Sequence, residues 1–165
     1  MVVAKQPLIT VVMPNYNGRS FVEQAIAAGA VAAVTDRQVG DCPCLVVKDT
    51  GRALQQIARF YREKFHPILV GITGSVGKTT TREMVAAALS AKYKTFKTPA
   101  NHNSQIGVPL TISEISENDE IGVLELGMSE PGEMTRIANV ARVNCAVVTN
   151  IGVAHIEQLG SQENI

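Results

Sequence analysis

Apolar positions follow two spacings along the chain. Short runs rich in β-branched residues predict strands at residues 9–13, 30–35, 44–47, 68–72, 95–98, 121–126 and 146–149. Apolar residues spaced by three or four predict helices at residues 19–28, 52–64, 78–91, 108–115 and 131–140. Pro131 would then lie in the first turn of the last helix, where proline is favoured. Strands that alternate with helices are typical of an α/β fold with a mostly parallel sheet and flanking helices.

A domain boundary is predicted after the helix at residues 52–64. His66 and Pro67 follow this helix, and a residue before proline is disfavoured in the helical region. We therefore expect a small, partial N-terminal α/β domain at residues 1–66 and a second, partial α/β domain at residues 67–165.

Composition and charge limit the partners that the chain could have. The chain has 165 residues, with 15 basic residues against 15 acidic ones. No net charge attracts nucleic acid, so a polyanion has to be held by a local site. The longest apolar runs are shorter than the roughly 18 residues of a membrane span, and the start does not resemble a secretory signal. We expect a cytoplasmic chain without a membrane span or a nucleic-acid partner.

The glycine-rich stretch GITGSVGKTTT, at residues 71–81, carries the strongest chemical signal. It lies between a predicted strand and a predicted helix, so backbone amides and the helix dipole would point at one place, where phosphate groups fit. The usual pattern G-x-x-x-x-G-K-[ST] requires glycine at position 72, where this chain has Ile72. The residues predicted to bind nucleotide phosphates are Thr73, Gly74, Ser75, Val76, Gly77, Lys78, Thr79 and Thr80.

Individual roles follow from residue type and position. Lys78 is expected to contact the β- and γ-phosphates, and the Thr79 hydroxyl is expected to bind Mg²⁺. Glu125 ends an apolar strand, and ligands of open α/β sheets bind at the carboxyl ends of strands, so its carboxylate suits the same ion. An ordinary strand-turn-helix with a solvated glutamate is the alternative.

Four ordered motifs resemble the Mur ligases and their relatives, the folylpolyglutamate and cyanophycin synthetases. The glycine loop has the form T-G-x-x-G-K-T. The other three motifs are NHNSQIGVPLT at residues 101–111, VLELGMSEPGEM at 123–134 and VVTNIGVAHIEQLGSQENI at 147–165. The resemblance implies that Glu125 binds Mg²⁺ beside Thr79, that His155 binds a second Mg²⁺, and that Asn103, with Ser104, faces the γ-phosphate.

The resemblance also implies a reaction. A Mur ligase uses ATP to convert a carboxylate into an acyl phosphate, which an amine attacks to form an amide. Lys78, Glu125 and His155 are the residues expected to take part in catalysis, because the charge on the transferred phosphoryl group needs stabilisation. The motifs are most similar to the branch of the family that joins UDP-MurNAc-tripeptide to D-Ala-D-Ala in peptidoglycan precursor synthesis.

The resemblance covers only part of such an enzyme. Residues 1–66 contain the stretch at 21–37, which looks like the end of the UDP-sugar-binding domain, and residues 67–165 look like part of the central ATP-binding domain. We therefore expect a truncated chain that lacks part of the catalytic apparatus. A nucleotide-binding module that does not ligate is an alternative.

The N-terminal stretch suggests a third hypothesis for the function of the chain. PLITVVMPNYNGRSFVEQAI, at residues 7–26, resembles the start of family 2 glycosyltransferases. A sugar-nucleotide transferase would use Asn15, Tyr16 and Asn17. The chain has no D-x-D metal motif downstream, which argues against this alternative.

Overall fold

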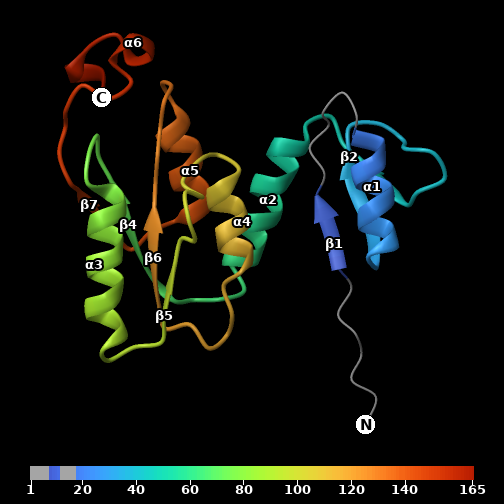
Figure 1. Ribbon diagram of the computed structural model, residues 1–165, viewed down its shortest axis with the longest axis horizontal. Coiled ribbons are helices and arrows are strands. Elements are labelled where there is room, and N and C mark those ends of the chain that lie inside the picture. Colours follow the sequence, from blue (N-terminus) through green and yellow to red (C-terminus); the bar gives the residue numbers. More distant parts are fainter. Residues whose placement is uncertain (1–7, 12–17) are drawn as a thin grey trace. The chain divides into compact units, whose positions relative to one another are not determined.

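The computed structural model describes residues 8–11 and 18–165 of the chain. The chain divides into two compact units, Met1–Leu54 and Gln55–Ile165 (Figure 1). Asn15, Tyr16 and Asn17, together with the end of the strand predicted at residues 9–13, lie outside the described residues. Among the described residues, no helix is both long enough and apolar enough to cross a bilayer.

The smaller unit contains a three-stranded parallel sheet. Its elements are β1 (Leu8–Val11), α1 (Gly18–Ala27), β2 (Ala30–Thr35) and β3 (Cys44–Val46). Strand β2 lies between β1 and β3 and pairs in parallel with both. Val22 of α1 is buried, as are Ala33 and Val34 of β2. The alternation of strand and helix predicted for this region is confirmed.

The larger unit contains a four-stranded parallel sheet in the order β5-β6-β4-β7. The strands are β4 (Ile68–Thr73), β5 (Thr95–Lys97), β6 (Ile121–Glu125) and β7 (Cys145–Val148). The chain passes from β4 to β5 and β6 on one side, and then to β7 on the other side of β4. A topological switch point therefore lies at the carboxyl end of β4, the position where open α/β sheets bind ligands.

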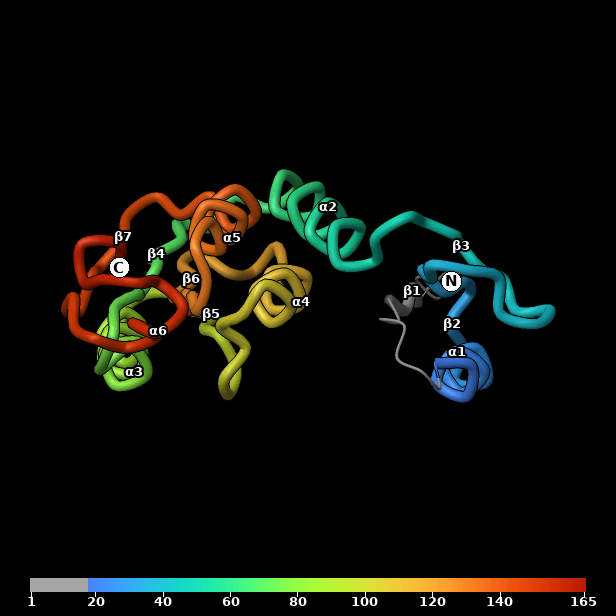
Figure 2. The backbone as a smooth tube through the Cα atoms, turned by 90° about the horizontal axis from the view of Figure 1, so that it is seen from above, coloured from blue at the N-terminus to red at the C-terminus, as the bar shows by residue number. Residues whose placement is uncertain are grey.

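Helices cover both faces of this sheet. The helices are α2 (Thr50–Arg62), α3 (Lys78–Ser90), α4 (Gly107–Ser113), α5 (Glu133–Ala141) and α6 (Ile156–Leu159), with a 3-10 turn at Gln162–Asn164. Figure 2 shows α3 on one side of the strands, and α4 and α5 on the other. The α/β fold with a mostly parallel sheet is confirmed.

Each face has its own apolar cluster. The α4/α5 face buries a large cluster: Ala58, Leu69, Val108, Ile112, Ile115, Leu124, Leu126, Ile137, Val140 and Ala141. The α3 face buries a small one, made by Ile72, Ala86 and Val123. Because side chains alternate along a strand, Leu124 lies on the first face, and Val123 and Glu125 lie on the second.

The compact units divide between Leu54 and Gln55, inside α2, because the second half of α2 contributes Ala58 to the large cluster. The predicted domain boundary at residue 66 stays a prediction. One predicted helix start differs from the structure. Helix α5 begins at Glu133, so Pro131 precedes the helix and the prediction that it lies in the first turn is wrong. Gly132 stands between them with a left-handed φ of 80°, which stops the helix from extending back to Pro131.

Candidate functional site

The glycine loop joins β4 to α3 through residues 74–77, and two of its glycines are required by geometry. Gly74 has a φ of 129°, and a Cβ at this position would lie 2.2 Å from the Thr149 hydroxyl oxygen. Gly77 has a left-handed φ of 84° at the N-terminus of α3. Any other residue would meet a clash or an unfavourable dihedral there.

The loop is bound to the segment that follows β7. The Ser75 amide donates to the Asn150 carbonyl at 3.1 Å, and the Val76 amide donates to Asn150 Oδ1 at 2.9 Å. The Thr149 hydroxyl donates to the Val76 carbonyl at 2.6 Å, and the Gly152 amide donates to Ser75 Oγ at 2.9 Å. These bonds fix the shape of the loop from outside.

This attachment leaves fewer backbone amides of the loop free to bind a ligand. We expected the loop amides as a group to converge on phosphates, but those of Ser75 and Val76 bond to Asn150. The amides of Lys78, Thr79 and Thr80 lie in the first turn of α3, where a helix offers no acceptor of its own. These first-turn donors, together with the positive end of the helix dipole, suit an anion.

Thr149 and Asn150 were missed as functional residues by the sequence analysis. The signals for them were their place in the motif at residues 147–165 and their position directly after the strand at residues 145–148, at the same sheet edge as the loop. Both act on the loop through hydrogen bonds that join distant parts of the sequence.

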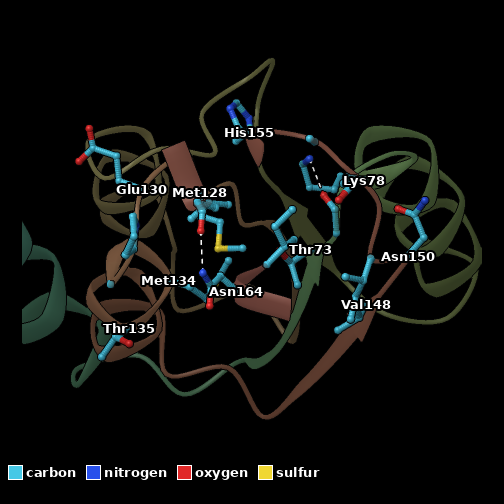
Figure 3. Close-up of a pocket in the computed structure, with 18 residues that line it drawn as sticks. Thr73, Lys78, Met128, Glu130, Met134, Thr135, Val148, Asn150, His155 and Asn164 are labelled. Atoms are coloured by element: carbon cyan, nitrogen blue, oxygen red, sulfur yellow. Dashed lines mark hydrogen bonds between the residues drawn. The ribbon is translucent and has the colours of Figure 1, made fainter. Parts of the chain in front are cut away.

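Lys78 lies at the loop and in the wall of a pocket. Its ammonium donates to the Gly74 carbonyl at 2.7 Å, so the side chain folds back over the loop. The pocket has a volume of about 350 Å³ and lies between the glycine loop, the segment 128–135 and the C-terminal residues. Figure 3 shows Lys78 and Asn150 on one side of the view, and Glu130, Met134 and Thr135 on the other.

Glu125 is brought together with Thr79 and Asn103. Its side chain is 2% exposed, and it ends β6 on the face that α3 covers. The Thr79 hydroxyl donates to Oε2 at 3.0 Å, and the Asn103 amide donates to Oε1 at 2.8 Å. A buried carboxylate requires such donors, because its charge has lost most of its water.

Arg82 completes this group and was not predicted. Its NH1 donates to Glu125 Oε2 at 3.2 Å, and the residue is 4% exposed. Thr79, Arg82 and Ala86 have the i, i+3, i+7 spacing of one helix face, so the residues that meet Glu125 belong to the face that packs on the sheet. This spacing was the signal in the sequence that could have found Arg82.

The geometry of Thr79 and Glu125 fits Mg²⁺. An octahedral Mg²⁺ with oxygen ligands at about 2.1 Å places neighbouring ligands about 3 Å apart, and the Thr79 hydroxyl oxygen lies 3.0 Å from Glu125 Oε2. Within residues 8–11 and 18–165, no group of three or more acidic, histidine or cysteine side chains could hold a metal ion. Two protein oxygens match the usual mode of Mg²⁺, which keeps water and phosphate as its other ligands.

His155 lies apart from the carboxylate group. It is an exposed residue of the pocket wall with a left-handed φ of 58°, just before α6. Among the described residues, the side chains that donate hydrogen bonds to Glu125 are those of Thr79, Arg82 and Asn103, and His155 does not belong to this group. Its role as a metal ligand stays a prediction.

Ser104 and Glu133 have structural partners. The Ser104 hydroxyl accepts the Gly107 amide at 3.2 Å, which satisfies one backbone donor at the start of α4. Glu133 Oε2 accepts the backbone amides of Ser129 and Glu130, at 2.6 and 3.1 Å. Partial burial would raise the pKa of Glu133, but the bonds from Ser129, Gln105 and Glu130 outweigh it and lower the pKa below 4.5.

Comparison with known proteins gives relatives that are named as ligases. UDP-N-acetylmuramoyl-tripeptide--D-alanyl-D-alanine ligase of Bacillus subtilis (strain 168) is 46% identical over 155 residues, covering 92% of this chain and 34% of that protein. The crystal structure of MurF from Acinetobacter baumannii has a TM-score of 0.86 at 31% identity, covering 94% of this chain and 35% of the other. MurF ligase from Thermotoga maritima in complex with ADP has a TM-score of 0.85 at 33% identity, covering 98% and 39%.

The chain thus spans about a third of the length of the Bacillus relative. Residues 72–165, more than half of the chain, match the Mur ligase middle domain. This match begins inside β4 and includes the glycine loop, Asn103, Glu125 and His155. The chain therefore belongs to the Mur ligase family.

Proposed function

We propose that this chain is part of a cytoplasmic, ATP-dependent amide ligase of peptidoglycan precursor synthesis, and that its larger unit holds the phosphates of ATP. The observation that carries the proposal is the Thr79 hydroxyl, 3.0 Å from the buried Glu125 carboxylate at the end of the glycine loop. Proteins named UDP-N-acetylmuramoyl-tripeptide--D-alanyl-D-alanine ligase support it, and so does a similar structure named as an ADP complex.

In this proposal, the first turn of α3 and Lys78 bind the phosphate groups. The Lys78 ammonium exchanges its bond with the Gly74 carbonyl for phosphate oxygens, which carry more charge. Thr79 and Glu125 hold Mg²⁺, which would neutralise charge on the phosphates. Asn103 orients Glu125 through its amide, and His155, in the pocket wall, would bind a second Mg²⁺.

The reaction joins a carboxylate to an amine. The terminal carboxylate of UDP-MurNAc-tripeptide attacks the γ-phosphorus of ATP, ADP leaves, and an acyl phosphate forms. The amine of D-Ala-D-Ala attacks the acyl carbon, and inorganic phosphate leaves with the bonding electron pair. The nitrogen releases one proton to solvent, and an amide forms. The first-turn amides of α3 and Lys78 stabilise the charge on the transferred phosphoryl group.

The two parts of the chain have different roles in the proposal. Residues 67–165 belong to the ATP-binding domain, and residues 1–66 form the end of the UDP-sugar-binding domain. The match of residues 72–165 to the middle domain supports the first assignment.

Binding of a fluorescent ADP analogue in the presence of Mg²⁺ tests the phosphate site. Lys78→Ala should weaken binding at least about tenfold, since a charge-assisted bond to phosphate is lost. Lys48→Ala, a change at an exposed lysine of the smaller unit, is the matched control and should leave the affinity unchanged. Equal affinities for the two variants would contradict the assignment of the loop.

Phosphate release tests the ligation. Release from ATP that requires both UDP-MurNAc-tripeptide and D-Ala-D-Ala supports a ligase. Binding of Mg-ATP without this dependence favours a nucleotide-binding module that does not ligate.

A further inference from the structure

Arg82 is a buried cation in the larger unit that the proposed reaction does not use. Its side chain is 5% exposed, and it projects from α3 between the sheet and the segment 98–103. Burial of a guanidinium is unfavourable unless acceptors surround it. The positions of the groups that accept hydrogen bonds from Arg82 therefore indicate the role of this residue.

The acceptors of Arg82 lie on two sides of the guanidinium. Its NH1 donates to Glu125 Oε2 at 3.2 Å and to the Ala100 carbonyl at 2.8 Å. Its Nε and NH2 donate to Glu83 Oε1 at 3.1 and 2.6 Å. Glu83 in turn pairs with Lys97, so the outer side of Arg82 is anchored at the surface.

The inner contacts of Arg82, which are its bonds to Glu125 and to the Ala100 carbonyl, act on the group around Glu125. Arg82 and Thr79 both donate to Oε2, whereas Asn103 donates to Oε1, so the orientation of the carboxylate is fixed from both ends. The Ala100 carbonyl belongs to the segment that leads to Asn103, and Ala100 has a left-handed φ of 44°. An alanine in this conformation is held against a steric preference, and the Arg82 bond is one of the contacts that hold it.

Arginine suits this task better than lysine. The guanidinium is a rigid fork whose donors point in fixed directions, so it reaches the carboxylate, the carbonyl and Glu83 together. An ammonium in its place would keep the charge but donate from a single nitrogen. It would lose at least part of this arrangement.

We propose that Arg82 is a positioning residue for the metal-nucleotide site: it fixes the Glu125 carboxylate beside Thr79 and the segment 98–103 that presents Asn103, without touching the nucleotide. The metal part of this inference rests on the proposed function. Residues that orient a metal ligand commonly change metal affinity by about 10-fold to 100-fold when they are replaced.

The first experiment measures the Mg²⁺ concentration that gives half-maximal binding of a fluorescent ADP analogue. Arg82→Lys should raise this concentration about tenfold, and binding of the analogue in EDTA should stay within about twofold of the unchanged chain. If Arg82→Lys weakened binding equally with Mg²⁺ and in EDTA, the role of Arg82 would be merely structural and the proposal would be overturned. An unchanged Mg²⁺ requirement would also overturn the proposal.

Two matched variants control for charge and surface effects. Arg52→Lys makes the same substitution at an exposed arginine and should change nothing. Glu83→Gln removes the outer anchor, whose carboxylate is 44% exposed, and should have an effect smaller than that of Arg82→Lys. A larger effect for Glu83→Gln would contradict the role of the inner contacts.

A second experiment needs no nucleotide. The Asn103 side-chain amide, bonded to Glu125 Oε1, should give a nitrogen-proton NMR signal with slow hydrogen exchange. Arg82→Lys should shift this signal and speed its exchange, whereas Arg52→Lys should not. An unshifted signal overturns the positioning role. If the unchanged chain binds no ADP, the proposed function fails, and this signal still decides the role of Arg82.

Discussion

The face of the larger sheet that α4 and α5 cover and the face that α3 covers are built from the same strands, but they bury different side chains. On the first face the buried cluster is aliphatic and extends from Ala58 to Ala141. On the second, a small apolar cluster gives way at the carboxyl end of the strands to Thr79, Arg82 and Glu125. Apolar burial stabilises folding in proportion to area, so the first face should carry most of the stability.

Strand β6 shows how one segment serves both faces. Leu124 packs into the large cluster, and its neighbour Glu125 turns to α3 and accepts three side-chain donors. Because side chains alternate along a strand, a substitution at Leu124 acts on one face of the sheet and a substitution at Glu125 acts on the other. Experiments on the two residues therefore distinguish the two faces.

The largest effect is expected from Leu124→Ala. Removing this fully buried side chain leaves a cavity and should lower the free energy of unfolding by about 2–5 kcal/mol. Urea unfolding measures it. The matched control is Leu110→Ala, because Leu110 is 41% exposed and should cost less than about 1 kcal/mol. Similar losses for both variants would contradict the division between the faces.

Glu125→Gln should have a smaller effect on stability and a clear effect on metal dependence. The amide keeps the shape of the side chain but leaves Arg82 without its buried counterion, so we expect a loss of about 1.5–3 kcal/mol in the free energy of unfolding. The Mg²⁺ requirement for ADP binding should rise. Glu117→Gln, at an exposed position, serves as the control. An unaltered Mg²⁺ titration for Glu125→Gln would count against its role as a ligand.

Asn150→Ala should loosen the glycine loop at a cost of about 1 kcal/mol in the free energy of unfolding. The Val76 amide loses its side-chain acceptor, and its hydrogen exchange should become faster. Exchange measured by NMR, residue by residue, checks this. Asn118→Ala changes an exposed asparagine and should leave the exchange of Val76 as it was.

The smallest effect is expected from Glu133→Gln, and it depends on pH. The pKa of Glu133 in the folded chain lies below its ordinary value of 4.5. Its ionised form therefore adds stability above about pH 4.5, and this contribution is lost as the pH falls through the folded pKa. Thermal unfolding should show the variant less stable than the unchanged chain at pH 7, and the difference should shrink at pH 3. A constant difference across this range, or one shared by Glu117→Gln, would argue against the effect.

Local patterns predicted much of the fold and part of the candidate site. The strand and helix periods were enough to predict the parallel sheet. Lys78 and Thr79 follow the glycines directly in the sequence, and Glu125 could be placed because it ends an apolar run at the ligand-binding edge. Each of these inferences needed only neighbouring residues and a general property of parallel sheets.

Two of the features that were not predicted depend on distant partners. In the sequence, Arg82 is one more charged residue on a predicted helix. Only the fold brings it into contact with Glu125, 43 positions away. The bond between Val76 and Asn150 spans 74 positions, and no period in the sequence reports it. The start of α5 was misplaced because the left-handed φ of Gly132 competes with the preference for proline in a first turn.

The attachment of the glycine loop to the segment after β7 also bears on how the protein is made. Contacts between residues far apart in sequence close large loops, and they form late and slowly. On the ribosome, residues 74–77 emerge well before Thr149 and Asn150, so the loop reaches its final shape only after β7 has been synthesised and paired with β4. A nascent chain that ends before residue 149 should carry the glycines and the lysine, but should bind nucleotide only weakly.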